Sequence, residues 1–176
     1  MQRLVLTGLL LLLLLLLPVV THGAAPRLLT ATVQQVSDGD SVTALTVHGT
    51  KLRLRLLGID APEVAHGTKP GQPYGEDARD YLDHLIGGKT VRVDAYGPDQ
   101  YNRVLAVLWD EQVNVNLLMV AMGYAEVYRG APCLVYCEDL RTAEAMARRD
   151  RVGMWAQGPK YESPRDFRRR LRLSGS

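Results

Sequence analysis

The sequence lacks the signatures of several large protein classes. Its 176 residues contain no internal repeat, no Walker loop, no dinucleotide-binding glycine fingerprint and no Ser-His-Asp signature. A repeat architecture and the enzyme classes defined by those motifs are therefore not indicated. Any chemistry must come from another arrangement of residues.

A strong net charge is also absent. Lys and Arg number 21 against 19 Asp and Glu, so the formal net charge is only +2. Attraction of a polyanion would therefore depend on local clusters of basic residues. Hydrophobic residues make up 47% and charged residues 23% of the chain, as is usual for a soluble globular protein. The length allows one well-packed domain.

A long apolar run is present at the N-terminus. Residues 1–25 have a basic start, a leucine-dominated run and small residues suited to cleavage around Gly23 to Ala25. This pattern predicts a secretory signal peptide. The alternative is an uncleaved N-terminal membrane anchor, because the run is slightly long for a signal and slightly short for a membrane span. Both predict a secreted protein or one in the periplasm or cell envelope.

Cysteine is scarce. The only two, Cys133 and Cys137, lie four positions apart. In the oxidising compartment that export predicts, a local disulfide is favoured. Two free thiols or half of a zinc site are the alternatives, but zinc normally takes four ligands and no histidine or further cysteine lies nearby in the sequence.

Alternating apolar residues and turn signals predict five strands. Asp-Gly and His-Gly pairs separate the first three, which form an antiparallel meander. In the third, the strict alternation of KLRLRL places leucines on one face and basic side chains on the other. The predicted strands cover residues 30–36, 40–47, 50–60, 89–96 and 103–110.

Three helices are predicted between and after the last strands. Residues 75–88 show helical spacing with acids in the first turn and two glycines at the end. Residues 113–125 form a short strand running into a helix, with Asn114 or Asn116 able to cap it. The last helix covers about residues 137–152.

The order of these elements predicts an α+β fold. Five short strands with Greek-key potential favour an OB-fold β-barrel, with about three α-helices packed against it. We expect this domain to cover residues 28–157. Residues 158–176 are rich in arginine and end in Ser-Gly-Ser, which predicts a basic, flexible C-terminal tail. The alternative is that this basic cluster helps to hold nucleic acid or an acidic surface.

Two acidic residues are candidates for a metal site. Asp40 follows the first turn and Asp60 ends the third strand, so the meander could bring both carboxylates to one rim of the barrel. Convergent carboxylates repel one another unless a cation neutralises them, and oxygen ligands favour calcium or magnesium over zinc. The alternative is that Asp38-Gly39-Asp40 forms only a hairpin turn.

Two arginines and a glutamate are candidates for catalysis. Arg55 and Arg103 both lie in or beside strands, and two guanidinium groups aimed at one place beside a cation would bind a phosphate strongly. Taken alone, Arg55 could equally belong to a solvated strand face. Glu63, just past Pro62, could orient or deprotonate an attacking water.

These residues lie in motifs that resemble the staphylococcal nuclease (thermonuclease) family. The similarity runs from about Thr32 to Trp155, through VSDGDSV, RLLGIDAPE, YGEDA, YNR and RVGMW. RLLGIDAPE is the most specific of these. The resemblance implies an OB-fold nuclease that hydrolyses DNA and RNA with calcium and leaves 3′-phosphate products.

The resemblance also implies roles for individual residues. Asp40, Asp60 and the backbone carbonyl of Ala61 would bind Ca²⁺. Arg55, Glu63 and Arg103 would be catalytic, and Tyr101 would help to hold a terminal phosphate. The chain departs from the best-known members at Gln100 and Asn102, where they have lysine and glycine, so one phosphate-facing charge is missing. Aromatic residues for base stacking are not assigned.

The sequence thus predicts an exported, calcium-dependent nuclease. DNA and RNA are the expected partners, with no obligate protein partner and a monomeric state, and membrane anchoring is expected only if the leader is uncleaved. One alternative is a non-catalytic OB-fold module that binds single-stranded nucleic acid or a protein. Another is a structural envelope protein, which nothing after Ala25 favours.

Overall fold

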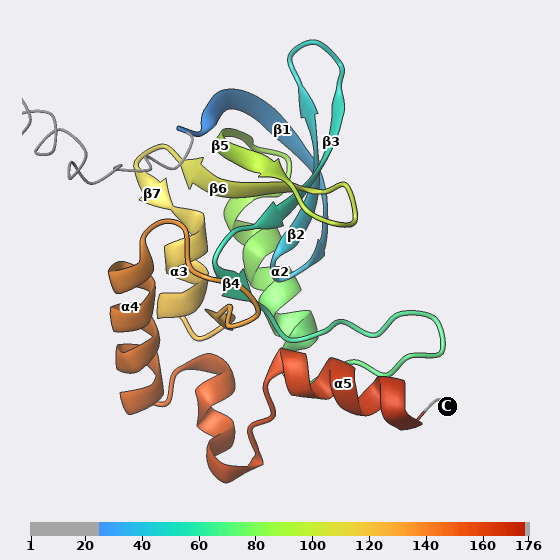
Figure 1. Cartoon of the computed structure of the whole chain (residues 1–176), viewed down its shortest axis with the longest axis vertical. Helices are drawn as coiled ribbons and strands as arrows, with labels where there is room; N and C mark the ends of the chain where they lie inside the picture. The colour runs from blue at the N-terminus through green and yellow to red at the C-terminus, as the bar shows by residue number, and fades with distance from the viewer. Residues whose placement is uncertain (1–24, 175–176) are drawn as a thin grey trace, which may run out of the picture.

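The computed structural model describes residues 25–174, and five of its strands form a closed barrel (Figure 1). The strands pair antiparallel in the order β3-β2-β1-β5-β6, and a parallel pairing of β3 with β6 closes the barrel. Their bounds are β1 Arg27–Asp38, β2 Ser41–Thr46, β3 Lys51–Leu56, β5 Thr90–Pro98 and β6 Val104–Asp110. The predicted OB-fold barrel is confirmed.

Three shorter strands complete the sheets. β7 (Val113–Asn114) extends the barrel sheet beside β6, while β4 (Ile59–Asp60) pairs antiparallel with β8 (Glu126–Val127). In that second pair Asp60 lies opposite Glu126. The pairing with β8 therefore holds the chain outside the barrel soon after the end of β3, the strand that carries Arg55.

The helices pack below the barrel in the view of Figure 1. They are α2 Gly75–Ile86, α3 Val115–Ala121, α4 Cys137–Arg149, the 3-10 helix η1 Gly153–Lys160, and α5 Pro164–Ser174. The predicted helices correspond to α2, α3 and α4. Asn114 caps α3, because its side chain accepts a hydrogen bond from the backbone N–H of Leu117 at 3.0 Å.

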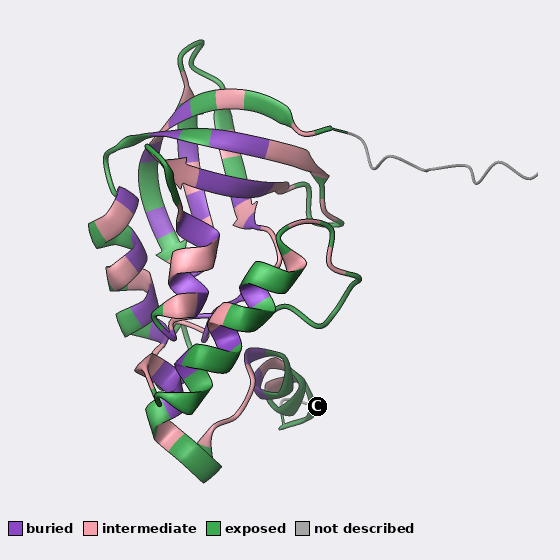
Figure 2. Cartoon of the chain, turned by 90° about the vertical axis from the view of Figure 1, so that its left-hand side faces the viewer, coloured by how far each residue is buried: buried purple, intermediate pink, exposed green. Residues whose placement is uncertain are grey.

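The core lies between the barrel strands and α2, α3 and α4 (Figure 2). As the alternation predicted, Leu54 and Leu56 of β3 are each 1% exposed. Trp155 belongs to a smaller apolar cluster with Ala147 and Met154. Burial of Leu54 and Leu56 removes apolar surface from water and fixes the position of β3, which carries Arg55.

The C-terminal segment corrects one prediction. Pro164–Ser174 is the helix α5, not a flexible tail, although most of its surface is exposed. Ser163, just before the helix, caps its N-terminus, because its hydroxyl oxygen accepts a hydrogen bond from the backbone N–H of Asp166 at 3.1 Å. Phe167 is 4% exposed and anchors the helix to the protein.

The predicted leader lies outside the described residues, apart from Ala25. Between residues 25 and 174, no helix has the length and apolar character needed to cross a membrane.

Candidate active site

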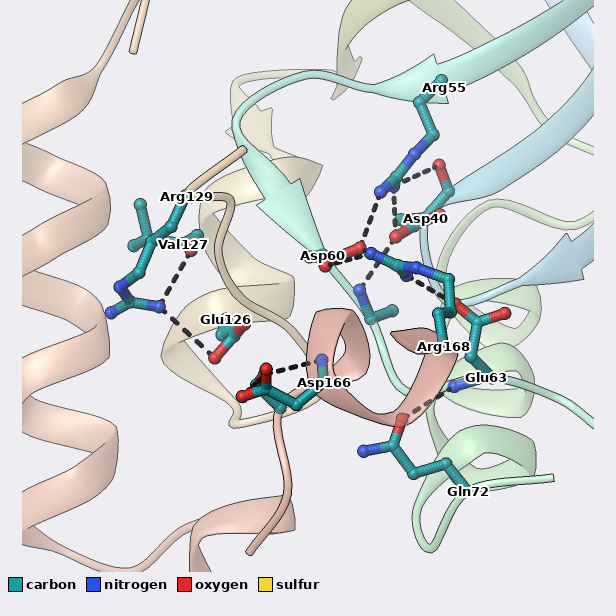
Figure 3. Close-up of polar contacts among 12 residues, drawn as sticks. Asp40, Arg55, Asp60, Glu63, Gln72, Glu126, Val127, Arg129, Asp166 and Arg168 are labelled. Carbon is teal, nitrogen blue, oxygen red and sulfur yellow. Dashed lines mark hydrogen bonds and ion pairs between the residues drawn. The ribbon is translucent and has the colours of Figure 1, made fainter. Parts of the chain in front are cut away.

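Arg55 joins two buried aspartates from different parts of the chain (Figure 3). Its Nη1 forms an ion pair with Asp40 Oδ2, and its Nη2 lies 2.9 Å from Asp60 Oδ1. Asp40 is 5% exposed and Asp60 is 1% exposed. Because both carboxylates contact one guanidinium group, they converge on one place, as the sequence predicted.

The environment of these groups changes their proton affinity. Burial raises the pKa of Asp40 to about 7, although the charge of Arg55 acts in the opposite direction. Burial opposes the charge of Arg55 as well, but Asp40 and Asp60 raise the pKa of its guanidinium. The charge of Arg55 therefore favours the ionised form of Asp40 and partly offsets the effect of burial.

The DGD segment is both a turn and part of the site. Asp38 pairs with Ser41 across the hairpin, and the Asp38 side chain accepts a hydrogen bond from the backbone N–H of Asp40 at 3.0 Å. A Cβ atom on Gly39 would lie 2.7 Å from the Cβ atoms of both Ala61 and Ala78. Only glycine lets the hairpin pack this closely against the strand exit and α2.

A second contact fixes the distance between the hairpin and the strand exit. The backbone N–H of Ala61 donates a hydrogen bond of 2.8 Å to Asp40 Oδ2. Ala61 therefore lies beside Asp40 and directly follows Asp60 in the chain.

Glu63 is held by two residues that the sequence did not single out for this purpose. The Gln72 backbone N–H donates to the Glu63 carbonyl at 2.8 Å, and the Glu63 N–H donates to Gln72 Oε1 at 3.3 Å. Gly75, in the YGEDA motif, begins α2 against the same backbone, and a Cβ there would lie 2.2 Å from the Glu63 carbonyl oxygen. The loop before α2 thus positions Glu63.

Asp99 orients Arg103 from within the turn before β6. Its Oδ1 accepts hydrogen bonds from the backbone N–H groups of Tyr101 and Arg103, both at 2.9 Å. Its Oδ2 accepts from Arg103 Nε at 2.8 Å and lies 2.7 Å from Arg103 Nη2. Asn102 in this turn has φ 57, a left-handed conformation that asparagine tolerates well.

Tyr101 is the exposed residue of this turn. It is 63% exposed, and the Arg103 guanidinium carbon lies 5.5 Å from the centre of its ring. The turn therefore presents an aromatic side chain and a fixed guanidinium group together.

Arg168, on α5, completes the cluster and was not predicted. Its Nη1 lies 3.0 Å from Asp60 Oδ1 and 2.5 Å from Glu63 Oε1, while its Nη2 lies 2.8 Å from Asp60 Oδ2 (Figure 3). More than 100 residues separate it from both carboxylates. The only signal in the sequence was the basic character of the C-terminal segment.

One cavity of about 800 Å³ brings most of these residues together. Among the predicted site residues, its walls include Asp40, Arg55, Ala61, Glu63, Tyr101 and Arg103. Asp60 borders a second cavity and joins the cluster through Arg55 and Arg168. All the predicted positions therefore lie at or beside one site.

The wall of the main cavity includes Cys133, one of the two predicted disulfide partners. Cys133 and Cys137 form a disulfide, so the alternatives of free thiols and half a zinc site are wrong. Cys133 and Leu134 both line this cavity, and they lie in the segment before α4.

The donor set fits a hard cation. Asp40, Asp60 and a backbone carbonyl at Ala61 offer only oxygen, which calcium and magnesium prefer. In the part of the chain that the structure describes, no group of three or more His, Cys, Asp or Glu side chains is arranged to hold a metal. The two carboxylates would give a cation only two negative charges, and their oxygens contact Arg55 and Arg168 in this structure.

The barrel and this cluster define an OB-fold protein with a basic, carboxylate-containing site suited to phosphate chemistry. Comparison with known families agrees. The family model described as "Staphylococcal nuclease homologue" matches residues 53–157, more than half of the chain. The chain belongs to this family.

Curated relatives carry a consistent name. Proteins named "Probable endonuclease LCL3" from Candida tropicalis and Pyricularia oryzae are 39% and 38% identical over 125 and 129 residues. These matches cover 67% and 69% of the chain, and 53% and 50% of the relatives. A relative of the same name from Sclerotinia sclerotiorum is 36% identical over 141 residues, or 76% of the chain and 52% of the relative. The chain spans about half the length of the curated relatives it matches.

Proposed function

We propose that the protein is an exported, calcium-dependent nuclease that hydrolyses phosphodiester bonds of DNA and RNA to 3′-phosphate products. The observation that carries this proposal is the convergence of Asp40 and Asp60 on Arg55, with Glu63 and Arg103 beside the same cavity. Membership of the nuclease family and the printed names of the relatives support it.

The arginines suit the charge that develops during hydrolysis. As water attacks phosphorus, negative charge grows on the equatorial oxygens, and Arg55 and Arg103 are placed to donate hydrogen bonds to them. Both guanidinium groups are already oriented by aspartates. Little reorganisation is therefore needed when the transition state forms, so these donors favour it over the ground state.

Glu63 suits the role of general base. It would take one proton from the attacking water as the new oxygen–phosphorus bond forms. The bond to the 5′-oxygen would break, and that oxygen would take a proton from solvent water. A divalent cation held by Asp40, Asp60 and the Ala61 carbonyl would add positive charge beside the same phosphoryl oxygens. Tyr101 would contact the terminal phosphate from the turn.

Export has separate support. The Cys133–Cys137 disulfide is the form expected of a protein from an oxidising compartment. A weak two-carboxylate site also suits extracellular calcium, at roughly 0.1 to 1 mM.

The test is cleavage of fluorescent single- and double-stranded DNA and RNA with Ca²⁺, with Mg²⁺, or with excess EGTA. We expect cleavage with Ca²⁺ that stops in EGTA, and products that a 3′-phosphatase can dephosphorylate. Glu63→Gln should lower kcat about a hundredfold or more while oligonucleotide binding is retained. Glu138→Gln, on an 86% exposed side chain of α4, is the matched control and should not change kcat.

Two results would contradict the proposal. Undiminished cleavage in EGTA would exclude calcium dependence. Tight oligonucleotide binding without cleavage, for any cation, would favour the alternative of a non-catalytic binding module.

A further inference from the structure

Arg168 occupies the carboxylate oxygens that a cation would need. Both oxygens of Asp60 accept hydrogen bonds from its guanidinium group, at 3.0 and 2.8 Å, and Glu63 Oε1 accepts a third at 2.5 Å. A planar fork matched to a carboxylate in this way is among the strongest side-chain contacts in proteins. Asp60 cannot keep this contact and also give an oxygen to a metal ion on the same side.

The helix that carries Arg168 is docked by several contacts of its own. Gln72 Nε2 donates a hydrogen bond of 2.6 Å to the Glu162 carbonyl just before α5. Tyr161 Oη lies 2.6 Å from Glu126 Oε2, and Phe167 is 4% exposed. Arg170 pairs with the Glu162 carboxylate within the same C-terminal segment, at 2.9 and 2.7 Å, and this pair does not join α5 to the rest of the protein. The position of Arg168 is therefore built by the surrounding segment.

Gln72 links this docking to the active site. The same side chain that holds the Glu162 carbonyl also accepts the backbone N–H of Glu63. The segment before α5 and the proposed general base thus share one support. The contact of Arg168 with Glu63 follows from this arrangement as well as from charge.

We propose that α5 is an autoinhibitory element in which Arg168 competes with the divalent cation for Asp60 and keeps Glu63 paired. This inference rests on the proposed function. In the inhibited form the guanidinium group neutralises the carboxylates. In the active form Arg168 leaves them, the cation binds Asp40 and Asp60, and Glu63 is free to accept a proton. Because the two forms exclude each other, Arg168 raises the cation concentration needed for activity.

The rival role for α5 is substrate binding. Arg165, Arg168 and Arg172 all line the main cavity, so the helix could instead form a wall that contacts phosphates. The three contacts of Arg168 with acidic side chains favour competition, because a phosphate-binding wall would not need to pair with the proposed base and metal ligand. The two roles predict opposite effects of removing the side chain.

The experiment is isothermal titration of the purified protein with CaCl₂ alone, for the wild type, Arg168→Ala and Arg170→Ala. Arg170 lies on the same helix, carries the same charge and pairs with Glu162, so it is the matched control. We expect Arg168→Ala to lower the Kd for Ca²⁺ about tenfold, equivalent to about 1.4 kcal/mol. Arg170→Ala should leave Kd unchanged. Circular dichroism melting confirms that each variant is folded, and Arg168→Gln replaces Arg168→Ala if the latter is not.

Cleavage assays complete the test. The calcium concentration for half-maximal cleavage should fall about tenfold in Arg168→Ala, with no rise in KM for the oligonucleotide. An unchanged or higher Kd for Ca²⁺ in Arg168→Ala would overturn the proposal. If KM for the oligonucleotide also rises in that case, the result favours a substrate-binding wall. If the wild type neither binds Ca²⁺ nor cleaves nucleic acid, the proposed function itself fails. If the wild type does both and the Arg168 variants bind Ca²⁺ no more tightly than the wild type, this inference alone fails.

Discussion

The contact between Asp99 and Arg103 offers a sharp test of how the site is oriented. Asp99→Asn keeps an oxygen that can accept the two backbone N–H groups of the turn. It replaces the second oxygen by an amide NH₂, which cannot accept from Arg103 Nε and Nη2. The change therefore frees the guanidinium group of Arg103, for which we propose a catalytic role, while the turn itself is retained.

The free energy expected to be lost when Asp99 no longer orients Arg103 lies between two known ranges. An exposed ion pair contributes about 0.2–1 kcal/mol, and a hydrogen bond to a charged group about 1.5–3 kcal/mol. Arg103 and Asp99 are 24% and 14% exposed in their side chains, so about 1.4 kcal/mol is a suitable intermediate value. It corresponds to about a tenfold lower kcat. Removing the donor completely in Arg103→Ala should cost on the order of a hundredfold.

The assay is the initial rate of cleavage of a fluorescent oligonucleotide over a range of substrate concentrations, with the melting temperature measured in parallel. We expect kcat to fall with little change in melting temperature. Asp110→Asn is the control, since Asp110 makes a similar ion pair with Lys89 away from the cavity. A kcat for Asp99→Asn within about twofold of the wild type, in folded protein, would refute the role assigned to Asp99.

The same pair predicts an acid-side change in stability. Burial alone would raise the pKa of Asp99, but hydrogen bonds from Arg103 and Tyr101 lower it below its ordinary value of 3.8. Because the folded-state pKa is the lower one, this contribution to stability is present above about pH 4 and is lost as pH falls through the folded-state pKa. Urea unfolding between about pH 3 and 6 should show a larger loss of stability on acidification in the wild type than in Asp99→Asn.

Two further substitutions test the supports of the site. Asn116 is buried; its side chain accepts a hydrogen bond from the backbone N–H of Leu108 and donates to the carbonyls of Leu57 and Ala106. Asn116→Ala should therefore lower the free energy of unfolding by about 3 kcal/mol and Tm by roughly 6–12 °C. A Tm within about 2 °C of the wild type would contradict this. In Gly75→Ala the new methyl group would push against the Glu63 carbonyl. A displacement of Glu63 by about 1 Å should lower kcat about a hundredfold. Full activity of the folded variant would show that Gly75 does not help to position Glu63.

Local patterns determined much of the fold. The alternation of KLRLRL decided which face of β3 is buried, because successive side chains of a strand point to opposite faces. Asp38-Gly39 marked the hairpin and Asn114 the start of α3, since turns and caps depend on neighbouring backbone groups. The motif RLLGIDAPE was informative for the same reason, because it holds Arg55, Asp60 and Glu63 within one strand and its exit.

Only the tertiary structure decided how the site is supported and which distant side chain pairs with its carboxylates. Gln72 appeared to be an ordinary loop residue, and its contacts with Glu63 and Glu162 join segments up to 90 residues apart. The C-terminal segment resembled a mobile tail because it has few apolar residues and many charges. Its helix is stabilised where Phe167 packs and Arg168 meets two carboxylates more than 100 residues away. Contacts of this kind leave no periodic pattern in the sequence, since they depend on where the fold brings distant side chains together.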